Sequence, residues 1–105
     1  MKTEVAILHH EYPAHVRERV ESKLQQLVKF YDRTVSVRAL LEKQHDVHRI
    51  ELVANVRRGV VLVVDARSEV FGKALDDAIH RMARVLTRHK DRLTEGHRRR
   101  TRERG

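Results

Sequence analysis

The sequence contains no cysteine and no tryptophan, a single proline, and only two phenylalanines and two tyrosines among its 105 residues. Without cysteine, neither a disulfide framework nor a thiolate metal site can form, and a reducing cytoplasm is the natural compartment. The few aromatics argue against a protein that stacks single-stranded RNA on an exposed sheet. No apolar run approaches the roughly 18 residues of a membrane span. We therefore expect a soluble, cytoplasmic protein without a membrane partner.

Basic charge is concentrated at the C-terminal end of the chain, which has a net charge of +8. Residues 1–78 carry 13 Lys and Arg against 12 Asp and Glu, whereas residues 79–105 carry 10 against 3. A nearly neutral body with one strongly basic end is typical of a protein that binds the phosphates of nucleic acid. The alternative is a solvated helix face whose arginines serve solubility, and the scarcity of balancing acids disfavours it.

The longest predicted element is an amphipathic helix over residues 69–93, in which apolar residues recur at spacings of three, four and seven. Ser68 is predicted to cap this helix. At about 100° per residue, most of its basic side chains gather on one flank of the buried stripe, while Lys90 lies on the other. The basic flank consists of Lys73, Arg81, Arg84, Arg88 and Arg92.

The rest of the chain predicts one more helix and four strands. Pro13 suits the first turn of an amphipathic helix over residues 14–31, on which Arg19 and Lys23 share one side. The predicted strands, recognised by alternating or short apolar runs, cover residues 4–9, 34–41, 49–56 and 60–67, with a polar loop at 42–46 and a turn at 57–59.

The resulting order, β-α-β-β-β-α, predicts an α+β fold. The first βαβ unit should be parallel with a right-handed crossover, and the remaining strands antiparallel. Two apolar helix stripes are most simply buried in a two-layer sandwich, a four-stranded mixed sheet with two helices on one face. The open sheet face would carry polar residues and a small apolar patch of Val53, Val61 and Val63. Residues 1–93 then form the domain, and residues 94–105 form a disordered basic tail.

Catalytic and metal-binding patterns are not found in the sequence. It has no Gly-rich phosphate loop, nucleophile elbow or His-Glu-x-x-His motif. Asp76 and Asp77 are neighbours on a helix and diverge by about 100°, which does not suit an acid/base pair. His45 and His48 offer two potential ligands where a metal site needs three or four. We therefore expect no enzymatic activity, cofactor, metal or small-molecule substrate.

Both helical segments carry a family likeness. Residues 16–27 (VRERVESKLQQL) are followed by FYDR at 30–33, and residues 74–82 (ALDDAIHRM) precede a basic series. Together they resemble the ribosome hibernation promoting factor and ribosome-associated inhibitor family. The likeness spans residues 4–93 and agrees with the element order derived above, although Gly72 stands where the family commonly has an aromatic.

The resemblance implies a protein that binds the small ribosomal subunit through its rRNA at the decoding region. There it would block mRNA and tRNA binding and silence translation in idle ribosomes, a stress response known as ribosome hibernation. The extra domain by which long members pair ribosomes is not expected, so we expect no direct role in pairing ribosomes. We also expect a monomer off the ribosome. With the basic flank and the first helix, the predicted RNA-binding residues are Arg19, Lys23, Lys73, Arg81, Arg84, Arg88, Lys90 and Arg92.

Two alternatives remain open. A double-stranded RNA-binding module has related elements in a different order and a lysine-rich start to its last helix, where this chain offers only Lys73. A structural or interaction protein could instead dimerise through Val53, Val61 and Val63.

Overall fold

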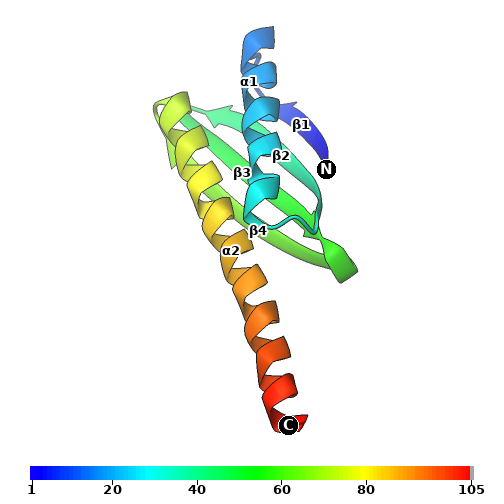
Figure 1. The fold of residues 1–105 in the computed structure, drawn as a ribbon. Coiled ribbons are helices and arrows are strands. Elements are labelled where there is room, and N and C mark those ends of the chain that lie inside the picture. Colours follow the sequence, from blue (N-terminus) through cyan, green and yellow to red (C-terminus); the bar gives the residue numbers. More distant parts are fainter. Residues whose placement is uncertain (105) are drawn as a thin grey trace.

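The computed structural model describes the backbone of residues 1–104 and the side chains of residues 1–94. Its four strands form one sheet in the order β1-β2-β3-β4, with β1 and β2 parallel and the other pairs antiparallel. Both helices lie on the same face of this sheet (Figure 1). The predicted two-layer α+β sandwich is therefore confirmed. The elements are β1 (Lys2–Leu8), α1 (Ala14–Gln25), η1 (Gln26–Phe30), β2 (Thr34–Gln44), β3 (Val47–Val56), η2 (Arg57–Gly59), β4 (Val60–Ser68) and α2 (Phe71–Arg104).

The core lies between the sheet and the two helices. Alternate residues of β2 and β3 point to the helices because successive strand side chains face opposite sides of a sheet. From α2, the apolar stripe predicted by spacing contributes residues at intervals of three and four. Each fully buried aliphatic side chain contributes about 1.5–3 kcal/mol. The largest buried side chains are Val20, Leu24, Leu27, Val37, Leu41, Ile50, Leu52, Leu75, Met82 and Leu86.

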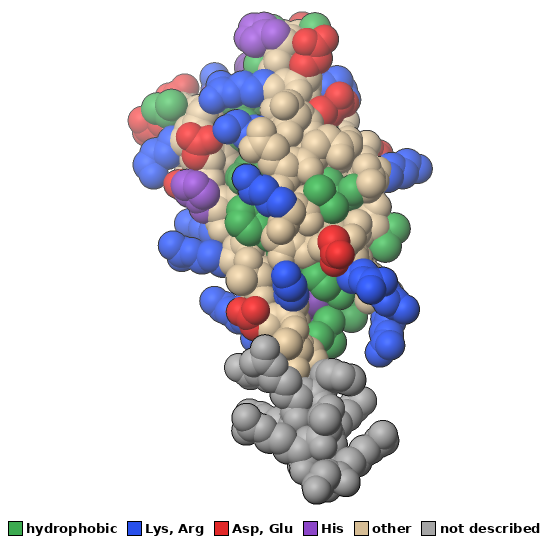
Figure 2. Space-filling model, viewed as in Figure 1, with side chains coloured by type: hydrophobic (Ala, Val, Ile, Leu, Met, Phe, Trp, Pro, Cys, Tyr) green, Lys and Arg blue, Asp and Glu red, His purple; other side chains and the backbone are tan. Residues whose placement is uncertain are grey.

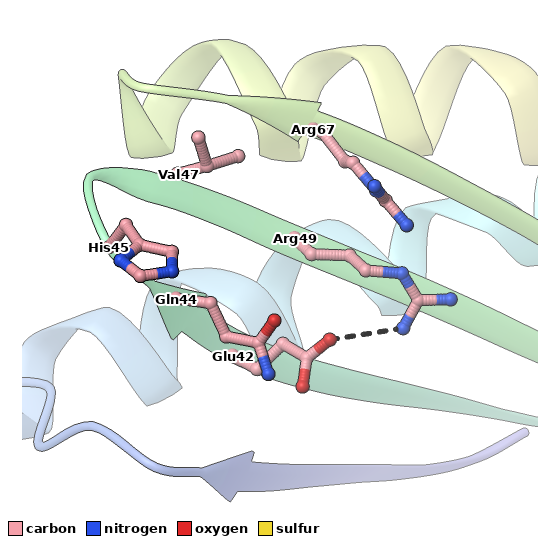
Figure 3. Close-up of a pocket in the computed structure, with 6 residues that line it drawn as sticks. All are labelled: Glu42, Gln44, His45, Val47, Arg49 and Arg67. Atoms are coloured by element: carbon pink, nitrogen blue, oxygen red, sulfur yellow. Dashed lines mark hydrogen bonds and ion pairs between the residues drawn. The ribbon is translucent and has the colours of Figure 1, made fainter.

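The opposite sheet face is open, as predicted. Val61 and Val63 are 52% and 55% exposed. Arg49 lies at the centre of an ionic network on this face, with Nε 3.2 Å from Asp65 Oδ2 and Nη1 3.4 Å from Glu42 Oε1 (Figure 3). Partial burial lowers the pKa of Arg49, but the hydrogen bond and charge of Asp65, with Glu51 and Glu42, outweigh burial and raise the pKa above its usual value. The positive charge of Arg49 is therefore offset by the carboxylates of Asp65, Glu51 and Glu42.

Several predicted boundaries were wrong, beginning with the loop at 42–46. β2 continues to Gln44 and β3 starts at Val47, so the connection is a two-residue turn in which His45 has a positive φ of 56°. The charged residues around this turn are compatible with strand because their side chains pair on the open face, as Arg49 does with Glu42. β1 likewise covers Lys2–Leu8 in place of residues 4–9.

The first helix is shorter than predicted. α1 ends at Gln25, and the chain tightens into the 3₁₀ segment η1 before the extended residue Tyr31. No glycine is present at this point to form a left-handed C-cap. The last carbonyls of the helix are instead satisfied by 3₁₀-type hydrogen bonds, such as the 3.2 Å bond from the Tyr31 N–H to the Val28 carbonyl. Pro13 occupies the N-cap position, and the helix starts at Ala14 as predicted.

The second helix starts later and ends later than predicted. Ser68 Oγ accepts a hydrogen bond of 3.1 Å from the Val70 N–H, ahead of the first turn, and the helix begins at Phe71. It continues as a helix to Arg104, although its apolar stripe ends at Leu93, because arginine and glutamate are good helix formers without tertiary support. The division into a domain of residues 1–93 and a disordered basic tail of residues 94–105 stays a prediction. The side chains of residues 95–105 lie outside the described part, and the role of this basic segment stays a prediction.

Candidate nucleic-acid interface

The outer surface of α2 presents Arg84 and Arg88. Both are exposed, and neither forms an ion pair within the side chains that the structure describes. They line an open groove of about 400 Å³ together with Thr87 and Asp91 of α2 and Phe30 of η1. Figure 2 shows Lys and Arg side chains along the outer edge of α2 and between the two helices. Free guanidiniums on a rigid helix suit phosphate binding, because their forked donors match phosphate oxygens.

Arg81 points toward the edge of the sheet. Its Nη1 donates a hydrogen bond to the backbone carbonyl of Asp65 in β4. β4 is an edge strand, whose outer carbonyls have no strand partner. One donor of the Arg81 guanidinium is therefore used in a contact within the fold, and the rest of the group remains at the surface. Arg84 has no such contact in the described part of the chain.

Lys73 is already paired. Its Nζ lies 3.0 Å from Asp77 Oδ2, one turn further along α2. The charge count along the flank overlooked this pair, although the i, i+4 spacing could have revealed it. Since both side chains are at the surface, the pair contributes little stability but offsets the local positive charge.

The first helix adds basic side chains across a groove from α2. Lys23 lines a hollow of about 180 Å³ whose α2 side includes Asp76, Ile79 and His80. Lys29 of η1 lines the same hollow. It was not predicted, because six residues along an α-helix separate it from Lys23 by about 240°.

Arg19 reaches the start of α2. Its Nη2 lies 3.7 Å from the point where a Cβ on Gly72 would be, which is ordinary van der Waals contact. A much larger side chain at this position would compete with Arg19 for that space. The glycine thus lets a basic group from α1 lie against α2.

Lys90 lies apart from these residues. It lines a cleft at the other end of the domain with Arg33, Arg57 and Arg58, none of which was predicted as a site residue. Arg92 is exposed on α2 beyond the sheet. The structure therefore brings Arg84 and Arg88 together in one groove and places Lys23 in an adjoining hollow. Arg81 and Lys73 are partly engaged within the fold, and Lys90 lines a separate cleft. Only the fold brings Lys90 next to the β3–β4 turn.

A cluster of rings holds the first turn of α2 in place. Tyr12 Oη and His48 Nδ1 share a hydrogen bond of 2.8 Å, and the Phe71 ring lies 5.2 Å from Tyr12 and 5.6 Å from His48. Burial lowers the pKa of His48, and the charges of Lys43 and His10 act in the same direction. Burial raises the pKa of Tyr12. The cluster joins β3, the start of α1 and α2, and so fixes where the basic helix begins.

Comparison with known proteins identifies the family. The profile of the Sigma 54 modulation protein / S30EA ribosomal protein family matches residues 4–94. The chain belongs to this family. The resemblance drawn from the two helices is thereby confirmed.

Relatives in the S30EA family support this assignment. Ribosome hibernation promoting factor of Escherichia coli (strain K12) is 29% identical over 80 residues, which cover 76% of this chain and 83% of that protein. The N-terminal domain of Thermus thermophilus Protein Y superposes with a TM-score of 0.74 at 21% identity, covering 85% of this chain and 99% of that one. A ribosomal subunit interface protein from Coxiella burnetii gives a TM-score of 0.78 at 16% identity, covering 87% and 99%. The two structures show that the fold is shared.

The described residues offer neither a metal site nor a membrane-spanning helix. Within the described residues, no three His, Cys, Asp or Glu side chains lie where they could hold a metal ion. In the same part of the chain, no helix combines the length and apolar character needed to cross a membrane. A hollow of about 340 Å³ on the open sheet face is lined by Arg49 and Arg67 near the β2–β3 turn (Figure 3), but carboxylates offset the charge of Arg49.

Proposed function

We propose that this protein binds the small ribosomal subunit at the decoding region and blocks mRNA and tRNA binding there, which silences translation in idle ribosomes. Membership of the S30EA family and the likeness to ribosome hibernation promoting factor support a ribosomal partner. The observation that carries the proposal is the pair Arg84 and Arg88, exposed on α2 and free of ion pairs among residues 1–94.

The proposed mechanism is steric and needs no chemical step. Lys23 of α1 lines one hollow, and Arg84 and Arg88 of α2 line an adjoining groove that shares Phe30 and Ala83 with it. A folded RNA surface could therefore meet both in this proposal. Binding would release counterions from the rRNA, and this release supplies most of the affinity. The protein then occupies space that mRNA and tRNA need. It acts as a monomer in this proposal.

The double-stranded RNA-binding alternative finds less support. Such a module needs free lysines at the start of its last helix, and Lys73 is the candidate there. Its ammonium group is 3.0 Å from the Asp77 carboxylate. A blunt RNA duplex of about 16 base pairs, the length such modules span, is the ligand that separates the two functions. We expect the protein to bind small subunits far more tightly than this duplex.

The central test is charge reversal on the free pair. Arg84→Glu combined with Arg88→Glu is expected to abolish co-sedimentation with purified small subunits, and to leave the melting temperature nearly unchanged because both residues are at the surface. Lys2→Glu with Arg67→Glu is the matched control, since it makes the same change in net charge on exposed strand residues that point to the open sheet face, away from the helices. Unchanged co-sedimentation of the Arg84/Arg88 variant would contradict the proposal.

A competition experiment tests the location. Small subunits programmed with mRNA and a peptidyl-site tRNA are mixed with the protein and separated on a sucrose gradient. We expect bound tRNA to exclude the protein, and excess protein to displace tRNA. Simultaneous binding of both at full occupancy would place the protein elsewhere on the subunit.

A further inference from the structure

A second basic cleft lies where α2 leaves the sheet. Its volume is about 370 Å³, and its walls come from the segment after η1, the η2 turn and the middle of α2. Figure 1 shows the β3–β4 turn at the end of the sheet that α2 passes before extending beyond it. The cleft is lined by Tyr31, Asp32, Arg33, Arg57, Arg58, Val60, His89, Lys90, Leu93 and Thr94.

Backbone contacts fix the walls of this cleft. The Arg57 N–H donates a hydrogen bond of 3.0 Å to the Arg33 carbonyl, which joins the η2 turn to the segment before β2. On the α2 side, the rings of Tyr31 and His89 are in edge contact with centroids 5.5 Å apart. Since Tyr31 is buried and Arg57 is tied to the sheet, the cleft is preformed.

The rim of the cleft is strongly cationic. Arg57, Arg58 and Lys90 form no ion pair among residues 1–94. Asp32 is the one acid in the lining, and its carboxylate is 3.9 Å from Arg33 Nε with both side chains largely in water. A pair this long and this exposed contributes almost nothing. The rim therefore has an uncompensated positive charge suited to a phosphate group.

The β3–β4 turn holds Arg58 in an unusual conformation. Arg58 has a φ of 72° and Gly59 a φ of 74°, so a non-glycine residue adopts the left-handed region. That conformation is unfavourable for an ordinary L-residue. Such strain often occurs at binding sites, where it presents a side chain in a fixed direction.

The cleft also has an apolar wall. Val60 is 37% exposed and Leu93 is 49% exposed, although both are aliphatic. Figure 2 shows Lys and Arg side chains beside exposed hydrophobic ones at the lower right, at this end of the domain. A simple anion needs no apolar wall, whereas a nucleotide has both a phosphate and an apolar face of ribose and base. Pockets of about 300–1,000 Å³ are of the size that takes such a ligand.

We propose that this cleft binds one nucleotide of an RNA strand, with its phosphate at the basic rim and its ribose or base against Val60 and Leu93. The inference rests on the proposed function, in which RNA is the partner, and adds a second contact site to it. Arg88 and Lys90 are two residues apart and so point about 200° apart around the helix axis. RNA would thus contact α2 on both sides.

The direct test uses the full chain without ribosomes. The methyl resonances of Val60 and Leu93 are followed by NMR during titration with a single-stranded RNA pentanucleotide, with AMP and with inorganic phosphate. We expect the RNA to shift both methyls in the wild-type protein. The shifts should be lost in Arg57→Glu with Lys90→Glu and retained in the control Lys2→Glu with Arg67→Glu. Arg58 is left intact because a substitution there would also alter the strained turn.

The outcomes separate the possible ligands. Methyl shifts with RNA alone support the proposal. Equal methyl shifts with inorganic phosphate would contradict a nucleotide as the ligand. If AMP binds as tightly as the RNA, the ligand is a free nucleotide and not an RNA strand. Absence of any shift with RNA would overturn the site itself.

A second measurement relates the cleft to the ribosome. Loss of two phosphate contacts should weaken binding of the Arg57→Glu, Lys90→Glu variant to small subunits by about tenfold or more. Suppose that the Arg57→Glu, Lys90→Glu variant binds small subunits with wild-type affinity while the Arg84→Glu, Arg88→Glu variant does not bind. That result would contradict the proposed RNA site in the cleft and would still support the proposed function. If the wild-type protein fails to bind small subunits, the proposed function fails, and the NMR titration still decides the cleft.

Discussion

Arg81 of α2 donates a hydrogen bond to the backbone carbonyl of Asp65 in β4. This contact joins the basic helix to the edge of the sheet, because β4 pairs only with β3. An edge strand with unpaired carbonyls can recruit strands from other molecules, and a cationic side chain over it hinders such pairing. Arg81 is therefore part of the fold as well as of the basic surface, which distinguishes it from Arg84 and Arg88.

Substitution of Arg81 by alanine should affect stability more than a substitution of Arg84 does. We expect Arg81→Ala to lower the free energy of unfolding by about 1 kcal/mol, the usual net contribution of one hydrogen bond. Arg84→Ala should change it by less than about 0.5 kcal/mol. Urea denaturation measures both. Equal values for the two variants would show that the Asp65 contact does not stabilise the protein.

Removal of the Asp77 carboxylate should strengthen RNA binding. Asp77→Asn frees the Lys73 ammonium group from its carboxylate partner 3.0 Å away. An i, i+4 ion pair stabilises a helix by a few tenths of a kcal/mol. Because RNA would no longer have to displace this pair, we expect the affinity to rise about twofold. The measurement is the dissociation constant for small subunits at low salt. Asp46→Asn, in the exposed β2–β3 turn, is the control with the same change in charge. An equal gain for both would reflect net charge alone.

Binding to the small subunit should depend steeply on salt. If about six phosphates are engaged, the logarithm of the affinity should fall with the logarithm of salt concentration at a slope of about five. Filter binding across a salt series gives this slope. A slope near zero would mean that phosphate contacts do not supply the affinity.

Acid should destabilise the ring cluster around His48. The pKa of His48 in the folded protein is lower than its ordinary value of 6.5, so the unfolded chain takes up the proton first as the pH falls. The resulting stability is complete above 6.5 and is lost as the pH drops toward the folded pKa. We expect His48→Gln to narrow the difference between melting temperatures at pH 7.5 and pH 5. Equal losses of melting temperature in both proteins would assign the acid sensitivity to groups other than His48.

The glycine at the start of α2 should be replaceable by alanine. A Cβ at Gly72 would be 3.7 Å from Arg19 Nη2, without a clash, and Gly72 has no positive φ. Alanine in a helix is favoured over glycine by up to about 1 kcal/mol, so Gly72→Ala should raise the stability by a similar amount. Thermal unfolding checks this. A lower melting temperature would show that the Arg19 contact is tighter than described.

Strand and helix order could be predicted because each element has its own periodicity. The apolar stripe of α2 and the alternation in β3 are local patterns. The strand directions follow from the connections, because a helix joins the parallel pair and short turns join the antiparallel pairs. The ends of elements were less predictable. β2 extends to Gln44 since its charged side chains pair across strands, and this stabilisation depends on a partner far away in sequence.

The candidate site, like the fold, could be predicted from the sequence only in part. Counting 100° steps identified the flank with Arg84 and Arg88, because positions around one helix depend only on sequence spacing. It could not show that Arg81 is bonded to β4 or that Arg33 and Arg57 join Lys90 in one cleft.

The sequence alone thus determined the elements, their order, the basic end and the family likeness, all of which depend on residue types at short and regular intervals. The tertiary structure alone decided which cations remain free. Whether a guanidinium meets a carbonyl, a carboxylate or water depends on how α2 packs beside β4 and past the η2 turn. Those neighbours come together only when the sheet forms.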